Sequence, residues 1–315
     1  MSDIDVLAVA KLSALLAPKL SAAFNVHDRL HETDAAAFVA LAPDIRAIAA
    51  SGESKVGVDL LRQLPALEII SVMGVGYDGI DVAAAKARNV IVTHTPNVLN
   101  DDVADLAIGL MLCAARQLPA ADRFVRAGEW PRGPMPLARK MSGARLGLVG
   151  MGRIGQAIAK RAEAFAMRVA YTARNGKPGL PYRYHQSAAA LAAESDFLVV
   201  ITPGGAGTRH LINAEVLAAL GSKGILVNVA RGSVVDEVAL IDALERGVIG
   251  GAGLDVFENE PNVPARLMAL PQVVLVPHIG SATGQTRQAM ADLALANLTA
   301  HFGGQRLPSP VPECA

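Results

Sequence analysis

The chain has 315 residues, a length that favours two domains over one. Its 29 Lys and Arg residues balance its 29 Asp and Glu residues, so we expect no partner that needs a basic surface, nucleic acid above all. Hydrophobic residues make up 52% of the sequence and charged ones 18%, which excludes global disorder. Two cysteines cannot form a disulfide framework, and no apolar run reaches the ~18 residues of a membrane span. We therefore expect a cytoplasmic protein with no membrane partner.

Short apolar runs alternate with Ala- and Leu-rich runs almost from end to end, which predicts an α/β fold of parallel strands joined by crossover helices. In the first 95 residues we expect strands at 5–10, 23–27, 45–50, 67–73 and 90–93. Helices are expected between them, near 11–22, 33–41, 57–63 and 81–87. These elements predict a small α/β unit.

A long helix is expected from residue 100 to about 126, kinked or broken at Pro119. Residues 127–143 hold three prolines, three glycines and the only tryptophan, and predict a loop. A second series of strands is expected near 145–150, 167–172, 196–201, 224–229, 250–254 and 273–276. The last helix, from about 282 to 302, has no further strand to build, so we expect it to return to the first unit.

A glycine-rich turn of the pattern GxGxxG lies between an apolar strand and an amphipathic helix, and consists of Gly150, Met151, Gly152, Arg153, Ile154 and Gly155. In that setting Gly150 permits the tight turn, Gly152 lets backbone amides approach a pyrophosphate, and Gly155 lets the helix pack on the strand. The helix N-terminus adds N–H donors and the positive end of its dipole. The motif alone could be a turn without a ligand, but with this strand and helix around it we predict a dinucleotide site.

The strand after this turn leads into Ala173, Arg174 and Asn175. An NAD site has an acidic residue about 20 residues beyond the turn, at the end of this strand. No carboxylate lies between Glu163 and Glu194, whereas several basic residues do. We therefore predict NADP(H) in preference to NAD(H), with Arg174 as the main partner of the 2′-phosphate. The alternative is that Arg174 is only a solvated cation.

Three polar residues each follow a strongly apolar strand of the second series: Arg231, Glu260 and His278. In an open parallel sheet the loops at the carboxyl ends of the strands gather around the ligand crevice, so these three side chains could converge. Each one alone could instead be structural, as an ion-pair partner, an exposed acid or a buried imidazole.

Four segments follow one another in the second half, GLVGMGRIGQAIA, NVARGSVVDE, GAGLDVFENEP and VPHIGSAT, and the first half contains SVMGVGYDGIDVAAAKARNVIVTHTPNVLNDDVADLAIGLML. In these motifs the chain resembles the D-isomer-specific 2-hydroxyacid dehydrogenases, and among them the glyoxylate/hydroxypyruvate reductases and the plant hydroxyphenylpyruvate reductases, which prefer NADPH. The resemblance implies two doubly wound parallel-sheet domains. A smaller, flavodoxin-like substrate domain is expected at 1–98 plus 285–315, and a Rossmann dinucleotide-binding domain at 99–284.

By this resemblance Arg231, Glu260 and His278 are the catalytic residues of an enzyme that reduces a small 2-keto acid to its 2-hydroxy acid. An imidazole titrates near neutrality and suits the proton donor, a carboxylate partner favours its charged form, and a guanidinium binds the substrate carboxylate or carbonyl oxygen. The substrate residues implied are Val75, Gly76, Arg231 and His278. Beyond the glycine turn and residues 173–175, the expected cofactor contacts are Thr202, Pro203, Thr208, Val229, Ala230, Asp255 and Gly280, with Asp255 matching the acid near the nicotinamide carboxamide.

The sequence does not choose among glyoxylate, hydroxypyruvate and arylpyruvates as substrate. A 2-ketogluconate-type reductase of the same family stays open, and so, with less support, does a nucleotide-sensing scaffold like the family's corepressors. The apolar helix at 103–115 is expected to be buried in its own domain or, by the resemblance, to form the two-fold interface of a homodimer toward which residues 127–143 reach. No metal site is predicted, because His27 and His31 have no evident third ligand and are expected to be solvated.

Overall fold

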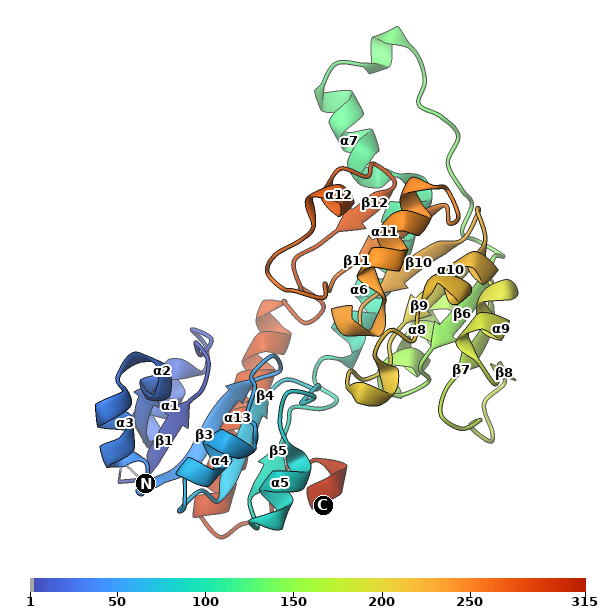
Figure 1. The fold of residues 1–315 in the computed structure, drawn as a ribbon. Coiled ribbons are helices and arrows are strands. Elements are labelled where there is room, and N and C mark those ends of the chain that lie inside the picture. Colours follow the sequence, from blue (N-terminus) through green and yellow to red (C-terminus); the bar gives the residue numbers. More distant parts are fainter. Residues whose placement is uncertain (1–2) are drawn as a thin grey trace. The chain divides into compact units, whose positions relative to one another are not determined.

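The computed structural model describes residues 3–315, and the chain divides into two compact units. One consists of Met1–Leu99 with Ala282–Ala315, and the other of Asn100–Ser281. Each unit has one parallel sheet with helices on both of its faces (Figure 1). The expected α/β class with two doubly wound parallel sheets is confirmed.

The sheet of the first unit has five strands in the order β2-β1-β3-β4-β5, which is the flavodoxin-like order. Its strands are β1 (Asp5–Ala8), β2 (Asn25–Asp28), β3 (Ile45–Ser51), β4 (Ile69–Met73) and β5 (Ile91–Thr93). Its helices are α1 (Ala17–Ala23), α2 (Leu30–Thr33), α3 (Ala35–Leu41), α4 (Val58–Gln63), α5 (Val82–Ala87) and α13 (Gly284–Phe302), followed by the short 3-10 helix η4 (Pro312–Cys314).

Strand β4 is buried along its whole length because helices cover both faces of this sheet. Ile70 and Val72 point into the core that contains Phe38 of α3 and Leu61 of α4. On the opposite face Ser71 lies against α13, the last helix of the chain, and its hydroxyl donates a hydrogen bond of 2.9 Å to the Ala294 carbonyl. Figure 1 shows α13 running along this sheet, so the last helix belongs to the first unit.

The sheet of the second unit has seven strands in the order β12-β11-β10-β9-β6-β7-β8. Its strands are β6 (Arg145–Val149), β7 (Arg168–Thr172), β8 (Arg183–His185), β9 (Phe197–Val200), β10 (Ile225–Asn228), β11 (Gly251–Leu254) and β12 (Val273–Leu275). Its helices are α6 (Asn100–Arg116), α7 (Leu118–Arg126), α8 (Arg153–Glu163), α9 (Ala188–Ala193), α10 (Ala214–Leu220), α11 (Glu237–Glu245) and α12 (Ala265–Met268), with 3-10 helices η1 (Trp130–Arg132), η2 (Ala206–Thr208) and η3 (Gly232–Val234). The order is that of a Rossmann sheet with one further strand at the β12 edge.

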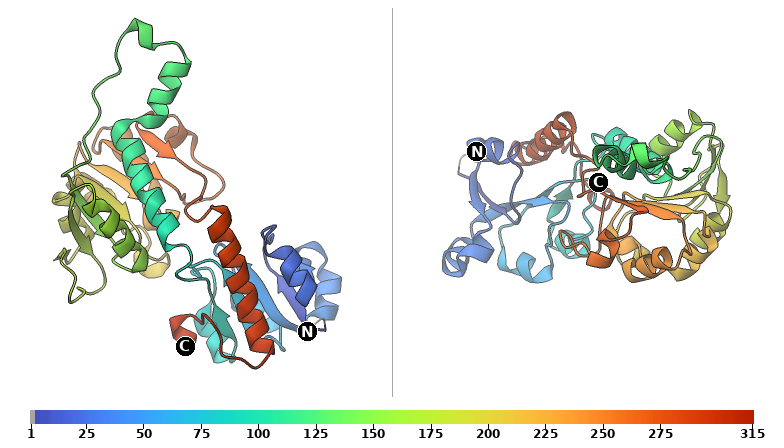
Figure 2. Two further views of the ribbon diagram at one scale, coloured as in Figure 1. Left: turned by 180° about the vertical axis from the view of Figure 1, so that it is seen from behind. Right: turned by 90° about the horizontal axis from the view of Figure 1, so that it is seen from above.

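Helices α6 and α8 cover one face of this sheet, and α9, α10 and α11 cover the other (Figure 2). The close fit of α6 depends on Gly253 in β11, where a Cβ atom would lie 3.0 Å from the Cβ of Leu110. Leu110 is 2% exposed and Met111 is fully buried. One face of the apolar helix expected at 103–115 is therefore buried within its own unit, whereas Leu106, Leu112 and Cys113 on the rest of the helix are half-buried.

The long helix expected at 100–126 breaks at Gln117, which has a left-handed φ of 52° between α6 and α7. Pro119 lies in the first turn of α7 and has no N–H to give to the Ala115 carbonyl, which accepts a hydrogen bond of 2.9 Å from the Arg139 N–H instead. Among the described residues no single helix is long and apolar enough to cross a membrane. The pair α6 and α7 reaches that length and composition only together, with a bend of 57° between them.

Three local predictions were wrong. Strand β8 was missed because its sequence, RYH, has no apolar run and it pairs only with β7 at the sheet edge. The helix expected at 11–22 begins only at Ala17, where Pro18 in its first turn suits a helix start. The strand expected at 23–27 begins at Asn25, because Phe24 still caps the preceding helix with its N–H.

Candidate functional site

The strands of the second unit end in register, so the loops that follow them leave from one edge of the sheet. Val149 of β6 is paired with Thr172 on one side and Val200 on the other, and Val200 is paired with Asn228. Asn228 is in turn paired with Leu254 of β11, and Leu254 with Leu275 of β12. In open α/β sheets ligands bind at this carboxyl edge. The predicted residues of this unit that follow these strand ends are Gly150, Ala173, Thr202, Val229, Asp255 and His278.

The glycine turn has the geometry of a tight strand-to-helix connection. Gly150 has a φ of 113°, and a Cβ there would lie 2.5 Å from the Ile201 carbonyl oxygen. A Cβ on Gly155 would lie 2.4 Å from the Gly150 carbonyl oxygen, which explains glycine at both positions. Gly152 differs, because a Cβ there meets no atom within 4 Å. Gly152 is the N-cap of α8, with no side chain bonded to the helix start.

Arg174 and Asn175 are exposed just beyond β7, and Ala173 is half-buried beside them. The two nearest carboxylates in the sequence have other partners: Glu163 accepts from the Tyr182 hydroxyl at 2.8 Å and Glu194 from Arg183 at 2.6 Å. Within residues 3–315 no carboxylate pairs with Arg174. The end of β7 is therefore locally basic.

The loop after β9 is closed by Thr208, whose hydroxyl donates a 2.7 Å hydrogen bond to the carbonyl of Pro203. Thr202 is half-buried at its start. After β10, Val229 and Ala230 are each 6% exposed, so their side chains belong to the core and only their backbone could face a ligand.

Arg231 lies where the segment after β10 closely approaches the segment after β11. A Cβ on the next residue, Gly232, would lie 1.9 Å from the carbonyl carbon of Phe257, so only glycine allows this approach. One guanidinium nitrogen of Arg231 donates to the Ala230 carbonyl at 2.9 Å. The fold thus brings the backbone of Arg231 beside the segment that leads from Phe257 to Glu260.

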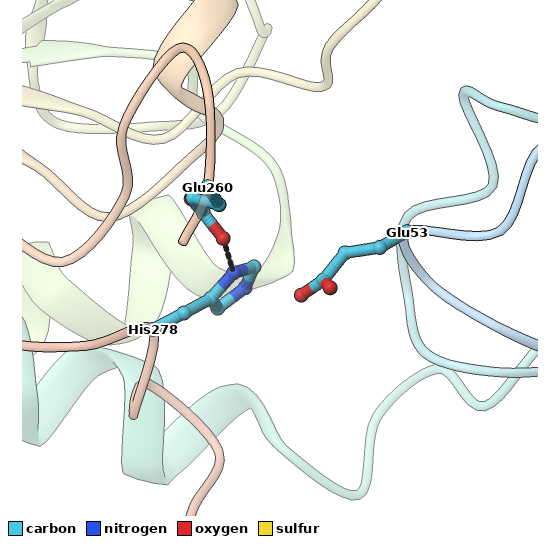
Figure 3. A group of neighbouring side chains, drawn as sticks. All are labelled: Glu53, Glu260 and His278. Carbon is cyan, nitrogen blue, oxygen red and sulfur yellow. Dashed lines mark hydrogen bonds and ion pairs between the residues drawn. The ribbon is translucent and has the colours of Figure 1, made fainter. Parts of the chain in front are cut away.

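His278 and Glu260 form a direct pair, with 2.7 Å between His278 Nδ1 and Glu260 Oε2 (Figure 3). The second oxygen of Glu260 accepts the Phe257 N–H at 2.9 Å, which fixes the carboxylate in its loop. A carboxylate accepts, so Nδ1 donates to Glu260, and a proton exchanged with a substrate would be carried by Nε2. The side chains are 30% and 23% exposed, so solvent and ligands can reach the pair.

The backbone of His278 adopts a left-handed φ of 52°, a conformation that non-glycine residues rarely adopt and that costs about 1–3 kcal/mol. Asp255 holds this turn: its carbonyl accepts the His278 N–H at 2.8 Å, and its carboxylate accepts the N–H groups of Ile279 at 2.6 Å and Gly280 at 2.9 Å. Burial raises the pKa of Asp255 above its ordinary value, against these backbone bonds, which lower it. Asp255 therefore fixes the backbone of residues 278–280, which carries the imidazole of His278.

A group of contacts around Glu258, two residues before Glu260, was not predicted; we call it the Glu258 clamp. Glu258 accepts hydrogen bonds from Arg209 at 2.8 Å and lies 3.0 Å from His210 Nε2, while its backbone N–H donates to Glu237 at 3.2 Å. Burial and the neighbouring Glu258 raise the pKa of Glu237. The motif FENEP gave no signal of these contacts, because Arg209 and His210 come from the segment after η2 and Glu237 is the first residue of α11.

Val75 and Gly76, the predicted substrate loop, lie in the first unit just after β4 and are half-buried. The expectation that His27 and His31 are solvated was wrong. Strand pairing brings His27 Nε2 to 2.7 Å from Asp5 of the neighbouring strand, and His31 packs its ring edge against Phe38 with its Nδ1 buried.

A Rossmann sheet with a glycine turn and an imidazole–carboxylate pair at its carboxyl edge defines a dinucleotide-dependent oxidoreductase as the class of protein. Residues 108–280 match the family model described as D-isomer specific 2-hydroxyacid dehydrogenase, NAD binding domain. The chain belongs to this family, which confirms the resemblance seen in its motifs.

Three relatives illustrate the match. The hydroxyphenylpyruvate reductase of Plectranthus scutellarioides is 46% identical over 312 residues, covering 99% of this chain and 100% of the relative. The 2-ketogluconate reductase of Gluconobacter oxydans is 43% identical over 307 residues and 98% of each chain. The crystal structure of an NADPH-dependent glyoxylate/hydroxypyruvate reductase from Sinorhizobium meliloti, in complex with NADP and malonate, is 47% identical, with a TM-score of 0.94 over 99% of this chain and 98% of that one.

Proposed function

We propose that this protein reduces a small 2-keto acid, such as glyoxylate, hydroxypyruvate or an arylpyruvate, to the D-2-hydroxy acid with NADPH. The observation that carries the proposal is the 2.7 Å pair of His278 and Glu260, which lies at the same sheet edge as the glycine turn. The second unit would be the dinucleotide-binding domain. The first unit would be the substrate domain, contributing Val75 and Gly76.

The residues at the glycine turn fit a dinucleotide. Glycine at 150 and 155 is required by contacts within the protein, but glycine at 152 is not, since a side chain there would meet open space. A small residue that the protein itself does not need is explained by the close approach of another molecule. The free N–H groups at the start of α8 suit a pyrophosphate, so the residues of this turn would hold the cofactor.

The basic end of β7 supports NADP(H) over NAD(H). Arg174 is exposed and pairs with no carboxylate among the described residues, so its guanidinium is available for a 2′-phosphate. Asn175 beside it offers further donors. The crystallised relative from Sinorhizobium meliloti is NADPH-dependent and was bound to NADP.

The bound nicotinamide would supply a hydride to the carbonyl carbon of the substrate. Negative charge then develops on the carbonyl oxygen, and the imidazolium of His278 would give its Nε2 proton to that oxygen. Glu260 would stabilise the charged imidazole before the transfer and hold the ring in the required orientation. Arg231 would bind the substrate carboxylate or carbonyl oxygen through its planar fork of donors.

A panel of 2-keto acids assayed with NADPH and with NADH tests this function. We expect reduction of glyoxylate, hydroxypyruvate or an arylpyruvate, with a higher kcat/KM for NADPH than for NADH. Equal kcat/KM for the two cofactors would contradict the cofactor proposal. A clear preference for 2-ketogluconate would favour the function of the Gluconobacter oxydans relative. Failure to turn over any 2-keto acid would refute the reductase.

We also propose that the protein is a homodimer. Helix α7 and residues 127–143 project from the second unit (Figure 1) and carry exposed apolar side chains: Leu118 (47%), Val125 (55%), Trp130 (66%) and Leu137 (101%). Sedimentation as a monomer would contradict this proposal.

The cytoplasmic location is proposed because Cys113 and Cys314 are both free thiols, the state that a reducing compartment maintains. Recovery of the protein in an exported fraction would contradict it.

A further inference from the structure

The loop after β4 in the first unit is tied to the end of β5 by two successive carbonyl groups. The Gly74 carbonyl accepts a hydrogen bond of 2.8 Å from the Thr95 N–H. The next carbonyl, that of Val75, lies 3.0 Å from Nδ1 of His94. A carbonyl oxygen can only accept, so Nδ1 of His94 carries the proton and donates it. Two consecutive peptide groups are therefore turned toward the same segment.

A trans peptide group points its C=O and its N–H in opposite directions. With the carbonyls of Gly74 and Val75 directed at residues 94–95, the N–H groups of Val75 and Gly76 are directed away from them. Within residues 3–315 neither N–H has a hydrogen-bond acceptor. Successive N–H groups on one side of a turn form a concave site for an anion such as a carboxylate.

His94 is itself held by the C-terminal tail. Its N–H donates to the Ser309 carbonyl at 3.1 Å, and its carbonyl accepts the Ser309 hydroxyl at 2.7 Å. Asn297 of α13 fixes Ser309 in turn, through hydrogen bonds of 2.9 Å to its hydroxyl and 3.0 Å from its N–H. His94, Ser309 and Asn297 are all buried, at 8%, 7% and 0% exposure. The donor on His94 thus has a fixed position.

The ring of His94 also contacts Tyr77 at the far end of the loop. The two rings meet edge to face, with 5.3 Å between their centroids. The Tyr77 hydroxyl donates to the carboxylate of Glu313 in the tail at 3.1 Å. Burial and Glu313 raise the pKa of Tyr77 to about 12, so the phenol stays protonated and keeps donating. The loop is braced on both sides of Val75 and Gly76.

We propose that His94 is a positioning residue, whose Nδ1–H holds the amide groups of Val75 and Gly76 in the orientation that binds the carboxylate of the 2-keto acid. This inference rests on the proposed function. His94 does not touch the reacting atoms, and it acts through the two peptide groups. Its effect should therefore appear in binding of the substrate carboxylate and not in binding of NADPH or in proton transfer.

Three variants test the proposal. His94→Leu removes the donor, whereas His94→Asn keeps an N–H donor at the same number of bonds from Cα. His301→Leu is the matched control, because His301 is a partly buried histidine of the same unit whose Nε2 lies 2.9 Å from Glu68, away from the loop. Steady-state assays would give kcat, KM for glyoxylate and KM for NADPH, and thermal unfolding would give Tm for each variant.

We expect KM for glyoxylate to rise about 3- to 10-fold in His94→Leu, the usual effect of one lost hydrogen bond, with kcat and KM for NADPH nearly unchanged. His94→Asn should restore most of the wild-type KM, and His301→Leu should lower Tm without changing KM. An unchanged KM for glyoxylate in a folded His94→Leu, or an equal rise in both KM values, would overturn the proposal. If the wild type reduced no 2-keto acid, the proposed function itself would be refuted. That result differs from a failure of the His94 proposal, in which the wild type is active and the KM of His94→Leu is unchanged.

Discussion

Replacing Glu260 by Gln tests whether the carboxylate stabilises a charged imidazole at His278. Gln keeps an oxygen for the Phe257 N–H, which Glu260 accepts at 2.9 Å, so the loop should stay in place. The charge opposite His278 Nδ1, at 2.7 Å, is lost. A hydrogen bond between charged groups contributes about 1.5–3 kcal/mol, and 1.4 kcal/mol corresponds to a factor of ten. The charged imidazole should therefore become about 10- to 100-fold less populated wherever its protonation is incomplete.

The sign of the pH effect follows from the direction of the reaction. Reduction needs the protonated imidazole, so the variant should lose about 10- to 100-fold in kcat at alkaline pH. The loss should be much smaller in the acid range, where the imidazole of His278 is charged in both the wild type and the variant. Oxidation of the 2-hydroxy acid needs the neutral imidazole and should be impaired less. The assay is kcat in both directions against pH. The reasoning would be refuted if the ratio of wild-type to variant kcat were the same at every pH.

Glu245→Gln is the matched control for this experiment. Glu245 is paired with Arg266 at 2.7 and 2.9 Å at the end of α11, and it contacts none of the predicted catalytic residues. The same substitution there should leave the pH dependence of kcat unchanged.

Three further predictions follow from the second unit. Arg174→Ala should raise KM for NADPH about 10-fold or more without affecting NADH, whereas Arg168→Ala, at the other end of β7, should change neither; equal effects on both cofactors would contradict the 2′-phosphate assignment. Gly232→Ala should destabilise the fold by about 1–3 kcal/mol and lower activity, because its Cβ would lie 1.9 Å from backbone atoms of Phe257; an unchanged Tm would disprove the close approach. The hydrogen bond from Arg145 lowers the pKa of Asp196, so this carboxylate stabilises the fold above its unfolded pKa and loses that effect as pH falls through the folded value. Asp196→Asn should therefore lower Tm at pH 7 and flatten its decline in acid, and equal Tm profiles would contradict the pairing.

The carboxyl edge of the second sheet could be predicted from sequence because its signals are local. The glycine pattern at 150–155 and the apolar strands before Arg231 and His278 lie within short stretches of chain, and parallel strands in register bring their ends to one edge. Strand β8 could not be predicted this way, since three residues at a sheet edge carry no periodicity.

Contacts between distant segments could not be predicted from the sequence either. The role of His94 depends on Ser309, which lies 215 positions further along the chain and reaches it only because α13 returns to the first sheet. Arg209 and His210, which bind the carboxylate of Glu258, likewise come from a segment 48 to 49 positions away. Neither residue type signals such a partner in the sequence, because a single His or Glu is equally compatible with an exposed surface.

The most direct test of the central claim is kcat for glyoxylate reduction by His278→Gln, measured together with NADPH binding by fluorescence titration. If His278 is the proton donor, kcat should fall by about 10²- to 10⁴-fold while the Kd for NADPH stays close to that of the wild type. Wild-type turnover in this variant would contradict the account.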